Sequence, residues 1–190
     1  MIKAVIFDCF GVLVAEGWLS FKERYLAHDP KAFAEASELN QQADAGLLSR
    51  QDFIEQVARL AKVDSSKVVV ALTSNAPNEP LFNYIQQLKT DYKIGLLSNA
   101  SANRLDTLFA PEQLGLFDAT VLSVESGLIK PHPAAYEKIA EELGVTVDEA
   151  IFIDDQERHC TGARKAGMRA IRYQNFNQLK TKLDELLGRS

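Results

Sequence analysis

The sequence has little of what characterises secreted, membrane-embedded or nucleic-acid-binding proteins. Its two cysteines, Cys9 and Cys160, lie far apart in a chain with no secretory pattern, which favours reduced thiols over a disulfide. Its apolar runs are far shorter than the roughly 18 residues that cross a bilayer. The 21 Lys and Arg residues, against 26 acidic ones, form no basic stripe. We therefore expect a cytoplasmic protein with neither a membrane nor a nucleic acid as its partner.

What the sequence does contain is typical of a globular domain. Apolar residues make up 46% and charged residues 25% of the 190 positions, which matches ordinary usage. A chain of this length can bury a core as one domain, or as one domain with a small insert. The oligomeric state stays open at this level, with a monomer as the preferred expectation.

Strand-like and helical segments alternate along most of the chain. Short apolar runs with the character of strands span residues 3–7, 93–97, 119–123, 151–153 and 169–173. Segments between them, such as 133–143 and 157–166, show the apolar spacing of helices. This alternation predicts an α/β fold with a Rossmann-like parallel sheet covered on both faces. In such sheets, ligands bind at the carboxyl ends of the strands.

One segment, between about residues 16 and 78, interrupts the alternation and contains no convincing strand. It is expected to hold helices at 18–27, 30–45 and 50–62. Gly46 suits a helix end, Ser49 a helix start, and Pro77 the start of a further helix.

These patterns predict two domains. Residues 1–15 and 79–190 would form the α/β core, and residues 16–78 an inserted helical cap. Residues 68–72 are ambiguous, and we expect a short helix there. Because the insert leaves after the first strand and returns before the second, it would cover the strand ends as a lid.

Polar residues follow the first two predicted core strands. Asp8 ends the first run, and Gly11 behind it allows a sharp turn close to a ligand. Taken alone, an aspartate at this place is usually a turn residue. Ser98 and Asn99 leave the second run, where they could hold a phosphate oxygen or simply cap the next helix.

Charged residues occur at two later strand ends. Lys130 lies between a predicted strand and a helix that begins at Pro133, although most loop lysines are simply solvated. Asp154 and Asp155 end an entirely apolar strand, and capping the next helix would require only one of them.

The combination of these stretches is more informative than any one of them. If the strand ends share one edge of the sheet, three carboxylates converge on one lysine. Each like-charge pair at about 4 Å costs on the order of 4 kcal/mol, so a cation is needed. A ligand set made only of oxygens suits Mg²⁺ better than zinc, which prefers histidine and cysteine.

The ordered set of motifs resembles the haloacid dehalogenase superfamily over nearly the whole chain. The matching residues are Asp8 in FDCFGVL, Ser98 in LLSNAS, Lys130 in GLIKPHPAAY, and Asp154 with Asp155 in IFIDD. They follow the family's order at spacings of 90, 32 and 24 residues. The helical block is similar to the small cap of the subgroup with many sugar-phosphate phosphatases and the 2-haloacid dehalogenases.

The resemblance implies a catalytic nucleophile and a metal site. Asp8 would attack phosphorus and become a transient aspartyl phosphate. Asp8, the backbone carbonyl of Phe10 and Asp155 would hold Mg²⁺, and Asp154 would act through a bound water.

The resemblance also implies a phosphate-binding set. Ser98 and the backbone of Asn99 would bind a phosphoryl oxygen, and Lys130 would balance the charge of the nucleophile and the phosphate. The expected function is a Mg²⁺-dependent phosphatase that acts on a small phosphorylated metabolite.

Phe10 departs from the family's phosphatase pattern, which has a second aspartate at this place as general acid and base. Losing such help costs typically 10² to 10⁴-fold in rate. Dehalogenases of the family commonly have an aromatic residue here, so a 2-haloacid dehalogenase is one alternative. A weak or non-catalytic phosphate-binding relative is another.

Two features oppose the dehalogenase alternative. Asp154 and Asp155 are both present, whereas dehalogenases of the family lack the pair and work without a metal. Their halide-binding arginine is also missing, because this chain has Leu39-Asn40-Gln41 in that region. The histidines are expected to be ordinary loop or helix residues, although each could replace the missing acid; they are His28, His132 and His159.

Overall fold

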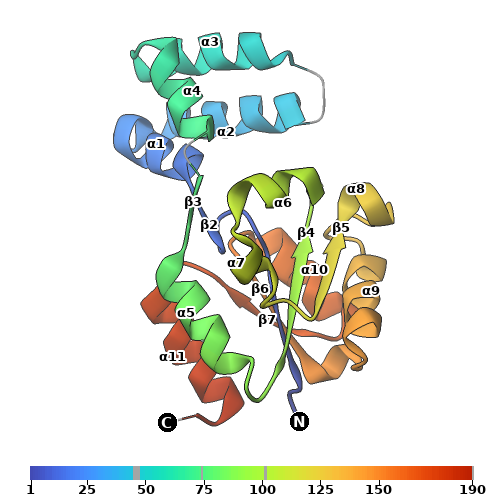
Figure 1. The fold of residues 1–190 in the computed structure, drawn as a ribbon. Helices are drawn as coiled ribbons and strands as arrows, with labels where there is room; N and C mark the ends of the chain where they lie inside the picture. Colours follow the sequence, from blue (N-terminus) through green and yellow to red (C-terminus); the bar gives the residue numbers. More distant parts are fainter. Residues whose placement is uncertain (45–47, 74, 101, 190) are drawn as a thin grey trace. The chain divides into compact units, whose positions relative to one another are not determined.

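The computed structural model describes residues 1–44, 48–73, 75–100 and 102–189. Its central sheet has five parallel strands in the order β5-β4-β1-β6-β7, with helices on both sides (Figure 1). In chain order, the strands are β1 (Ala4–Phe7), β4 (Lys93–Ser98), β5 (Ala119–Leu122), β6 (Ala150–Asp154) and β7 (Arg169–Arg172). The predicted α/β fold is therefore confirmed.

The helices that accompany this sheet follow its strands in the chain. They are α5 (Glu79–Leu88), α6 (Ala102–Leu108), α7 (Pro111–Leu114), α8 (Ser123–Ser126), α9 (Pro133–Leu143), η1 (Val147–Glu149), α10 (Glu157–Ala166) and α11 (Phe176–Leu187). The predicted bounds of α9 and α10 agree with the structure. Their capping glycines, Gly144 and Gly167, adopt the left-handed conformation that ends a helix.

The central strands are buried on both faces, because alternate side chains enter two apolar clusters. On one face, Val5 and Phe7 of β1 pack in a cluster that also contains residues of α5 and α11. On the other face, Ala4 and Ile6 pack in a cluster with residues of α9 and α10. All four strand residues are fully buried. This arrangement holds the strand ends in fixed register.

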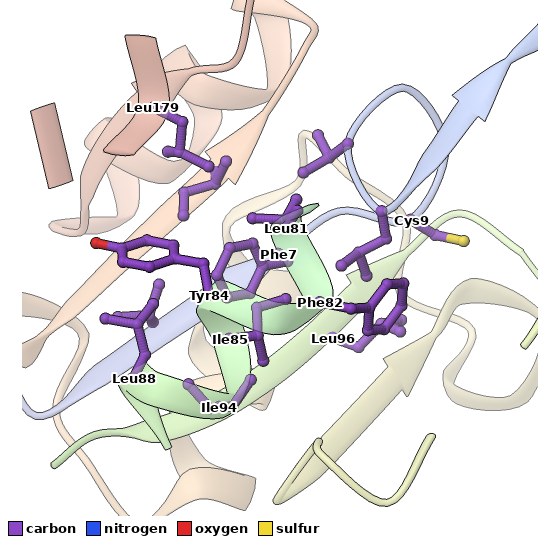
Figure 2. Packing of buried hydrophobic residues seen from close by; sticks show 14 of the residues in the cluster. Phe7, Cys9, Leu81, Phe82, Tyr84, Ile85, Leu88, Ile94, Leu96 and Leu179 are labelled. Carbon is purple, nitrogen blue, oxygen red and sulfur yellow. The ribbon is translucent and has the colours of Figure 1, made fainter. Parts of the chain in front are cut away.

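Helix α5 supplies much of the first cluster. Figure 2 shows Leu81, Ile85 and Leu88 of α5 packed close to Phe7 and Ile94 of the sheet. All five of these side chains are fully buried. Fully burying a leucine or isoleucine side chain is worth about 1.5–3 kcal/mol, so α5 anchors the sheet strongly.

The chain divides into two compact units, Met1–Ala15 with Pro77–Ser190, and Glu16–Ala76. The second unit contains four helices among its described residues: α1 (Gly17–Leu26), α2 (Pro30–Asp44), α3 (Arg50–Ala61) and α4 (Ser65–Thr73). They enclose an apolar cluster of their own, in which Trp18 lies 5.8 Å from Phe21 and 5.4 Å from Phe53, ring centre to ring centre.

Several local predictions for this segment are confirmed. The Ser49 side chain accepts a hydrogen bond from the backbone N–H of Asp52 at 3.1 Å and caps α3. The ambiguous residues 68–72 lie within α4. The predicted helix end at Gly46 lies outside the described residues.

Two predictions for this segment are wrong. Short strands β2 (Val14–Glu16) and β3 (Asn75–Pro77) form a two-stranded sheet where no strand was expected. Pro77 ends β3 rather than beginning a helix, and α5 starts at Glu79. The reason is a long-range contact, because the backbone and side chain of Asn78 donate to the carbonyl oxygens of Leu13 and Val12.

Candidate active site

The carboxyl ends of the three middle strands carry the residues that the motifs singled out. Asp8 directly follows β1, which lies between β4 and β6 in the sheet. Ser98 is the last residue of β4, and Asp154 is the last residue of β6. The register pairs Phe7 with both Leu96 and Ile153, so these ends are nearly level.

Lys130 joins two of these ends. Its Nζ lies 2.7 Å from Oδ1 of Asp8 and 2.8 Å from Oδ2 of Asp154. The Lys130 side chain is only 1% exposed, and the two carboxylates are 7% and 0% exposed. Breaking a buried pair of this kind is strongly destabilising, because it leaves an uncompensated charge. Lys130 is therefore not a solvated loop lysine.

Burial and neighbouring charges both shift the pKa values of Asp8 and Lys130. The pKa of Asp8 is raised, because burial penalises its charged form and Asp154 adds negative charge, which together outweigh Lys130. Burial alone would lower the pKa of Lys130, but Asp8 and Asp154 raise it. A further cation beside Asp8 would favour its ionised, nucleophilic form.

The pKa of Asp154 is shifted the other way. Burial alone would raise it, but a hydrogen bond from His159 and the charge of Lys130 lower it below the ordinary value. Asp154 is therefore the carboxylate that most firmly carries a negative charge beside Lys130.

Three carboxylates are close enough to share a metal ion. Asp8, Asp154 and Asp155 each offer an oxygen within 4.8 Å of the others. With Lys130 as the buried cation among them, an excess of negative charge remains. A donor set made of carboxylate oxygens fits Mg²⁺ chemically, and the residual charge favours a divalent ion.

Gly11 makes room for one of these carboxylates. Its φ is +83°, and a Cβ at this position would lie 2.7 Å from Cγ of Asp155. The positive φ therefore favours glycine at this turn, and a Cβ there would force the Asp155 carboxylate to move. Arg172 holds the backbone of the same aspartate, because its Nε donates to the backbone oxygen of Asp155 at 3.1 Å.

The side chain of Asn99 forms two hydrogen bonds with the backbone of Lys130. Its Oδ1 accepts from the Lys130 backbone N–H at 2.9 Å, and its Nδ2 donates to the Lys130 backbone oxygen at 3.1 Å. The neighbouring Ser98 is 2% exposed. The side chain of Asn99 thus fixes the loop that carries Lys130, a contact that the sequence pattern did not indicate.

Phe10 is partly buried, and its side chain packs against the first apolar cluster. Its backbone forms an isolated parallel bridge with Val14 within the turn after β1. The phenyl ring has no group that can donate or accept a proton. Phe10 therefore cannot serve as a general acid, and a part for its backbone carbonyl in metal binding stays a prediction.

His159 is a site residue, although the sequence pattern indicated an ordinary helix residue. Its Nδ1 lies 3.0 Å from both carboxylate oxygens of Asp154, and the residue is 3% exposed. The signal that points to it is its place in the first turn of α10, five residues after the strand-end Asp154. His132 instead caps α9, where its Nδ1 accepts from the Ala134 backbone.

With the fold and the strand-end cluster in place, comparison with known proteins gives the family. The model of haloacid dehalogenase-like hydrolases matches residues 2–167, and the chain belongs to this family. A curated relative, "Phosphatase MT3486" of Mycobacterium tuberculosis, is 40% identical over 80 residues, which are 41% of this chain and 37% of the relative. The chain thus spans little more than a third of this relative's length.

Solved structures share the fold. HAD family enzyme bt-2542 of Bacteroides thetaiotaomicron, in complex with magnesium and inorganic phosphate, is 22% identical, covers 94% of this chain and 99% of its own, and has a TM-score of 0.58. L-2-haloacid dehalogenase of Xanthobacter autotrophicus, with chloropropionic acid covalently bound, is 22% identical and has a TM-score of 0.61. The match covers 99% of this chain and 83% of the dehalogenase chain. In the part of the chain that the structure describes, no helix is both long and apolar enough to cross a membrane.

Proposed function

We propose that this hydrolase is a Mg²⁺-dependent phosphatase that acts on a small phosphorylated metabolite through an aspartyl-phosphate intermediate. The observation that carries the proposal is the buried Lys130 ammonium, held between Asp8 and Asp154 with Asp155 nearby. Phosphoryl transfer depends mainly on positioning and on charge neutralisation, and this cluster supplies both.

Asp8 is the nucleophile in this proposal. Its free carboxylate oxygen attacks phosphorus, the bond to the leaving oxygen breaks, and water later cleaves the aspartyl phosphate. Lys130 contacts Asp8 directly and balances the negative charge of the nucleophile and the phosphoryl group. Ser98 and the backbone of Asn99 bind a phosphoryl oxygen.

Asp8, the Phe10 carbonyl and Asp155 would hold the magnesium ion, and Asp154 would act on it through a bound water. When bound, Mg²⁺ neutralises charge that develops on the phosphoryl oxygens. The turn at Gly11 supports this assignment, because it leaves room for the Asp155 carboxylate. The neighbour solved with magnesium and inorganic phosphate adds support from a protein of the same fold.

Phe10 narrows the proposed substrate range. Without an acid at this position, a leaving oxygen of high pKa lacks a proton donor, so activated esters and acyl phosphates should turn over faster than sugar phosphates. General acid catalysis is worth typically 10² to 10⁴-fold, so a difference of that order is expected. Similar rates on an unactivated sugar phosphate would mean that another residue supplies the proton.

Residues 16–78 are proposed to act as the cap domain that selects the substrate. The support is the compact unit Glu16–Ala76, whose described residues form four helices and which lies between β1 and β4 in the chain. A cap of this kind selects substrates by shape. Replacing it with a short linker should broaden the range of accepted phosphate esters.

Phosphate release from p-nitrophenyl phosphate, with magnesium and with a chelator, tests the proposed function. Turnover should require Mg²⁺ and should fall to background in Asp8→Asn. Asp148→Asn is the matched control, because Asp148 is exposed and lies in η1, outside the carboxylate cluster. Phosphate release that persists in Asp8→Asn, or that ignores the metal, would refute the proposal.

Two further measurements separate the alternatives. A dehalogenase would release chloride from 2-chloropropionate without magnesium, and the Asp154–Asp155 pair argues against this outcome. A non-catalytic binding protein would be stabilised thermally by magnesium with inorganic phosphate and would turn over nothing on a broad panel.

A further inference from the structure

His159 is a buried histidine whose imidazole lies within hydrogen-bond distance of Asp154, one of the three carboxylates of the cluster. It lies in the first turn of α10, and only 3% of its surface is exposed. Its Nδ1 is 3.0 Å from each oxygen of Asp154, whose side chain is fully buried. Because an ionised carboxylate only accepts hydrogen bonds, Nδ1 is the nitrogen that carries the proton.

Among the described residues, Asp154 receives one donor from the loop that carries Lys130 and two from the start of α10. Lys130 Nζ donates to Oδ2 at 2.8 Å, and the Gln156 backbone N–H donates to Oδ1 at 2.8 Å. The third donor is His159, which lies within reach of both oxygens. The carboxylate therefore has a fixed orientation, and Lys130 is held on one of its two oxygens.

The backbone of His159 is itself held in place. The hydroxyl of Tyr136, a buried residue of α9, donates to the His159 carbonyl at 2.8 Å. Close packing supports this contact, because a Cβ at Gly162 would lie 2.7 Å from Pro131 and 2.8 Å from the Tyr136 hydroxyl. These contacts between α9 and α10 fix the backbone of His159 and so limit the movement of its imidazole.

The second ring nitrogen of His159 differs from the first in its surroundings. Nε2 of His159 is buried and has no hydrogen-bond partner among the described residues. A buried polar atom without a partner destabilises a fold by about 1–3 kcal/mol. That cost offsets part of the stabilisation that the bond from Nδ1 to Asp154 provides, so variants have to separate the donor from the stability of the fold.

We propose that His159 is a positioning residue: by donating from Nδ1 to Asp154, it orients the carboxylate that holds the Lys130 ammonium beside Asp8. The effect on turnover rests on the proposed phosphatase function. The hydrogen bond and its effect on Lys130 do not.

Two substitutions of His159 separate the effect of its hydrogen-bond donor from the effect of the size of its side chain. An asparagine side chain can place an amide donor near the position of Nδ1, so His159→Asn should keep kcat within about fivefold of the parent. His159→Leu fills similar space without a donor, and kcat should fall about 10- to 100-fold while KM changes far less. Arg158→Leu, an exposed neighbour in the same turn, is the control and should behave as the parent.

Equal losses in the Asn and Leu variants would overturn the proposal, as would full activity in the Leu variant. Unfolding by urea, measured in parallel, identifies any variant that fails through loss of fold. Such a variant is set aside, and the spectroscopic readouts on the parent and on His159→Asn then decide.

Nuclear magnetic resonance on the metal-free protein gives a readout that does not depend on activity. Imidazole ¹H–¹⁵N correlations should show a proton on Nδ1 of His159, and a proton on Nε2 alone would overturn the proposal. Because Lys130 is buried and paired, its ammonium should give a ¹H–¹⁵N signal. That signal should persist in His159→Asn and shift or broaden in His159→Leu. If the parent releases no phosphate, the proposed function fails, while these signals still decide the part of His159.

Discussion

Gly11→Ala tests whether the turn after β1 shapes the metal site. Gly11 has a φ of +83°, and an alanine Cβ there would lie 2.7 Å from Cγ and 2.9 Å from Oδ2 of Asp155. A comfortable carbon contact is about 3.5–4.0 Å, so the carboxylate has to move. We expect two separate effects, one on the backbone and one on the metal.

The backbone effect can be isolated with a matched variant. Gly144 also has a positive φ, +67°, but a Cβ there would meet no heavy atom within 4 Å. Alanine in the left-handed region costs about 1–2 kcal/mol, so both variants should lose that much unfolding free energy without metal. In Gly11→Ala the Cβ also displaces the Asp155 carboxylate, and the difference between the two variants measures the free energy of that displacement.

The metal effect appears only when magnesium is added. Moving a ligand carboxylate out of place should weaken Mg²⁺ binding in Gly11→Ala by about tenfold or more, which is about 1.4 kcal/mol. Gly144→Ala should bind magnesium as the parent does. Titration calorimetry gives both affinities, and urea unfolding with and without magnesium checks them. Parental magnesium affinity in Gly11→Ala would show that Asp155 is not a ligand held by this turn.

Two further predictions concern groups outside the metal cluster. Burial alone would raise the pKa of Asp118, but hydrogen bonds from the Ile94 backbone N–H and Lys89 lower it below the ordinary value. Its contribution of about 1 kcal/mol is therefore present above its ordinary pKa and lost as the pH falls through the lowered value. Urea unfolding of Asp118→Asn should show this deficit at about pH 7, and the deficit should shrink as the pH falls below the ordinary pKa of an aspartate. A deficit that does not change with pH would refute the sign. Burial raises the pKa of the Cys160 thiol to about 11. Iodoacetamide at about pH 8 should therefore leave Cys160 unmodified in the folded protein and label it after unfolding in urea. Rapid labelling of the folded protein would contradict this burial.

The alternation of apolar strands and amphipathic helices was sufficient to predict the core fold. Each strand buried on both faces reads as a short continuous apolar run, as in 151–153, and β6 spans Ala150–Asp154. Such patterns are local, because they depend on the period of the backbone and on burial. The polar residues at the ends of these strands were equally visible, since the apolar runs stop at Phe7 and at Ile153.

Long-range contacts were not visible in the same way. The error at Pro77 arose because Asn78 bonds the backbone of Leu13 and of Val12, the latter 66 positions earlier in the chain, and this pairing extends β3. No local pattern reports a partner that far away. The same limit hid the bond between Asn99 and the backbone of Lys130, which joins two loops.

The residue types and the order of the chemical groups could thus be read from the chain alone, together with the sheet that brings the strand ends to one edge. Folding in three dimensions decided which groups touch. Lys130 became a buried bridge between two carboxylates, and a helix histidine became the third donor to Asp154. The physical reason is that hydrogen bonds and ion pairs depend on ångström-scale distances between segments, whereas hydrophobic periodicity depends only on neighbours along the chain.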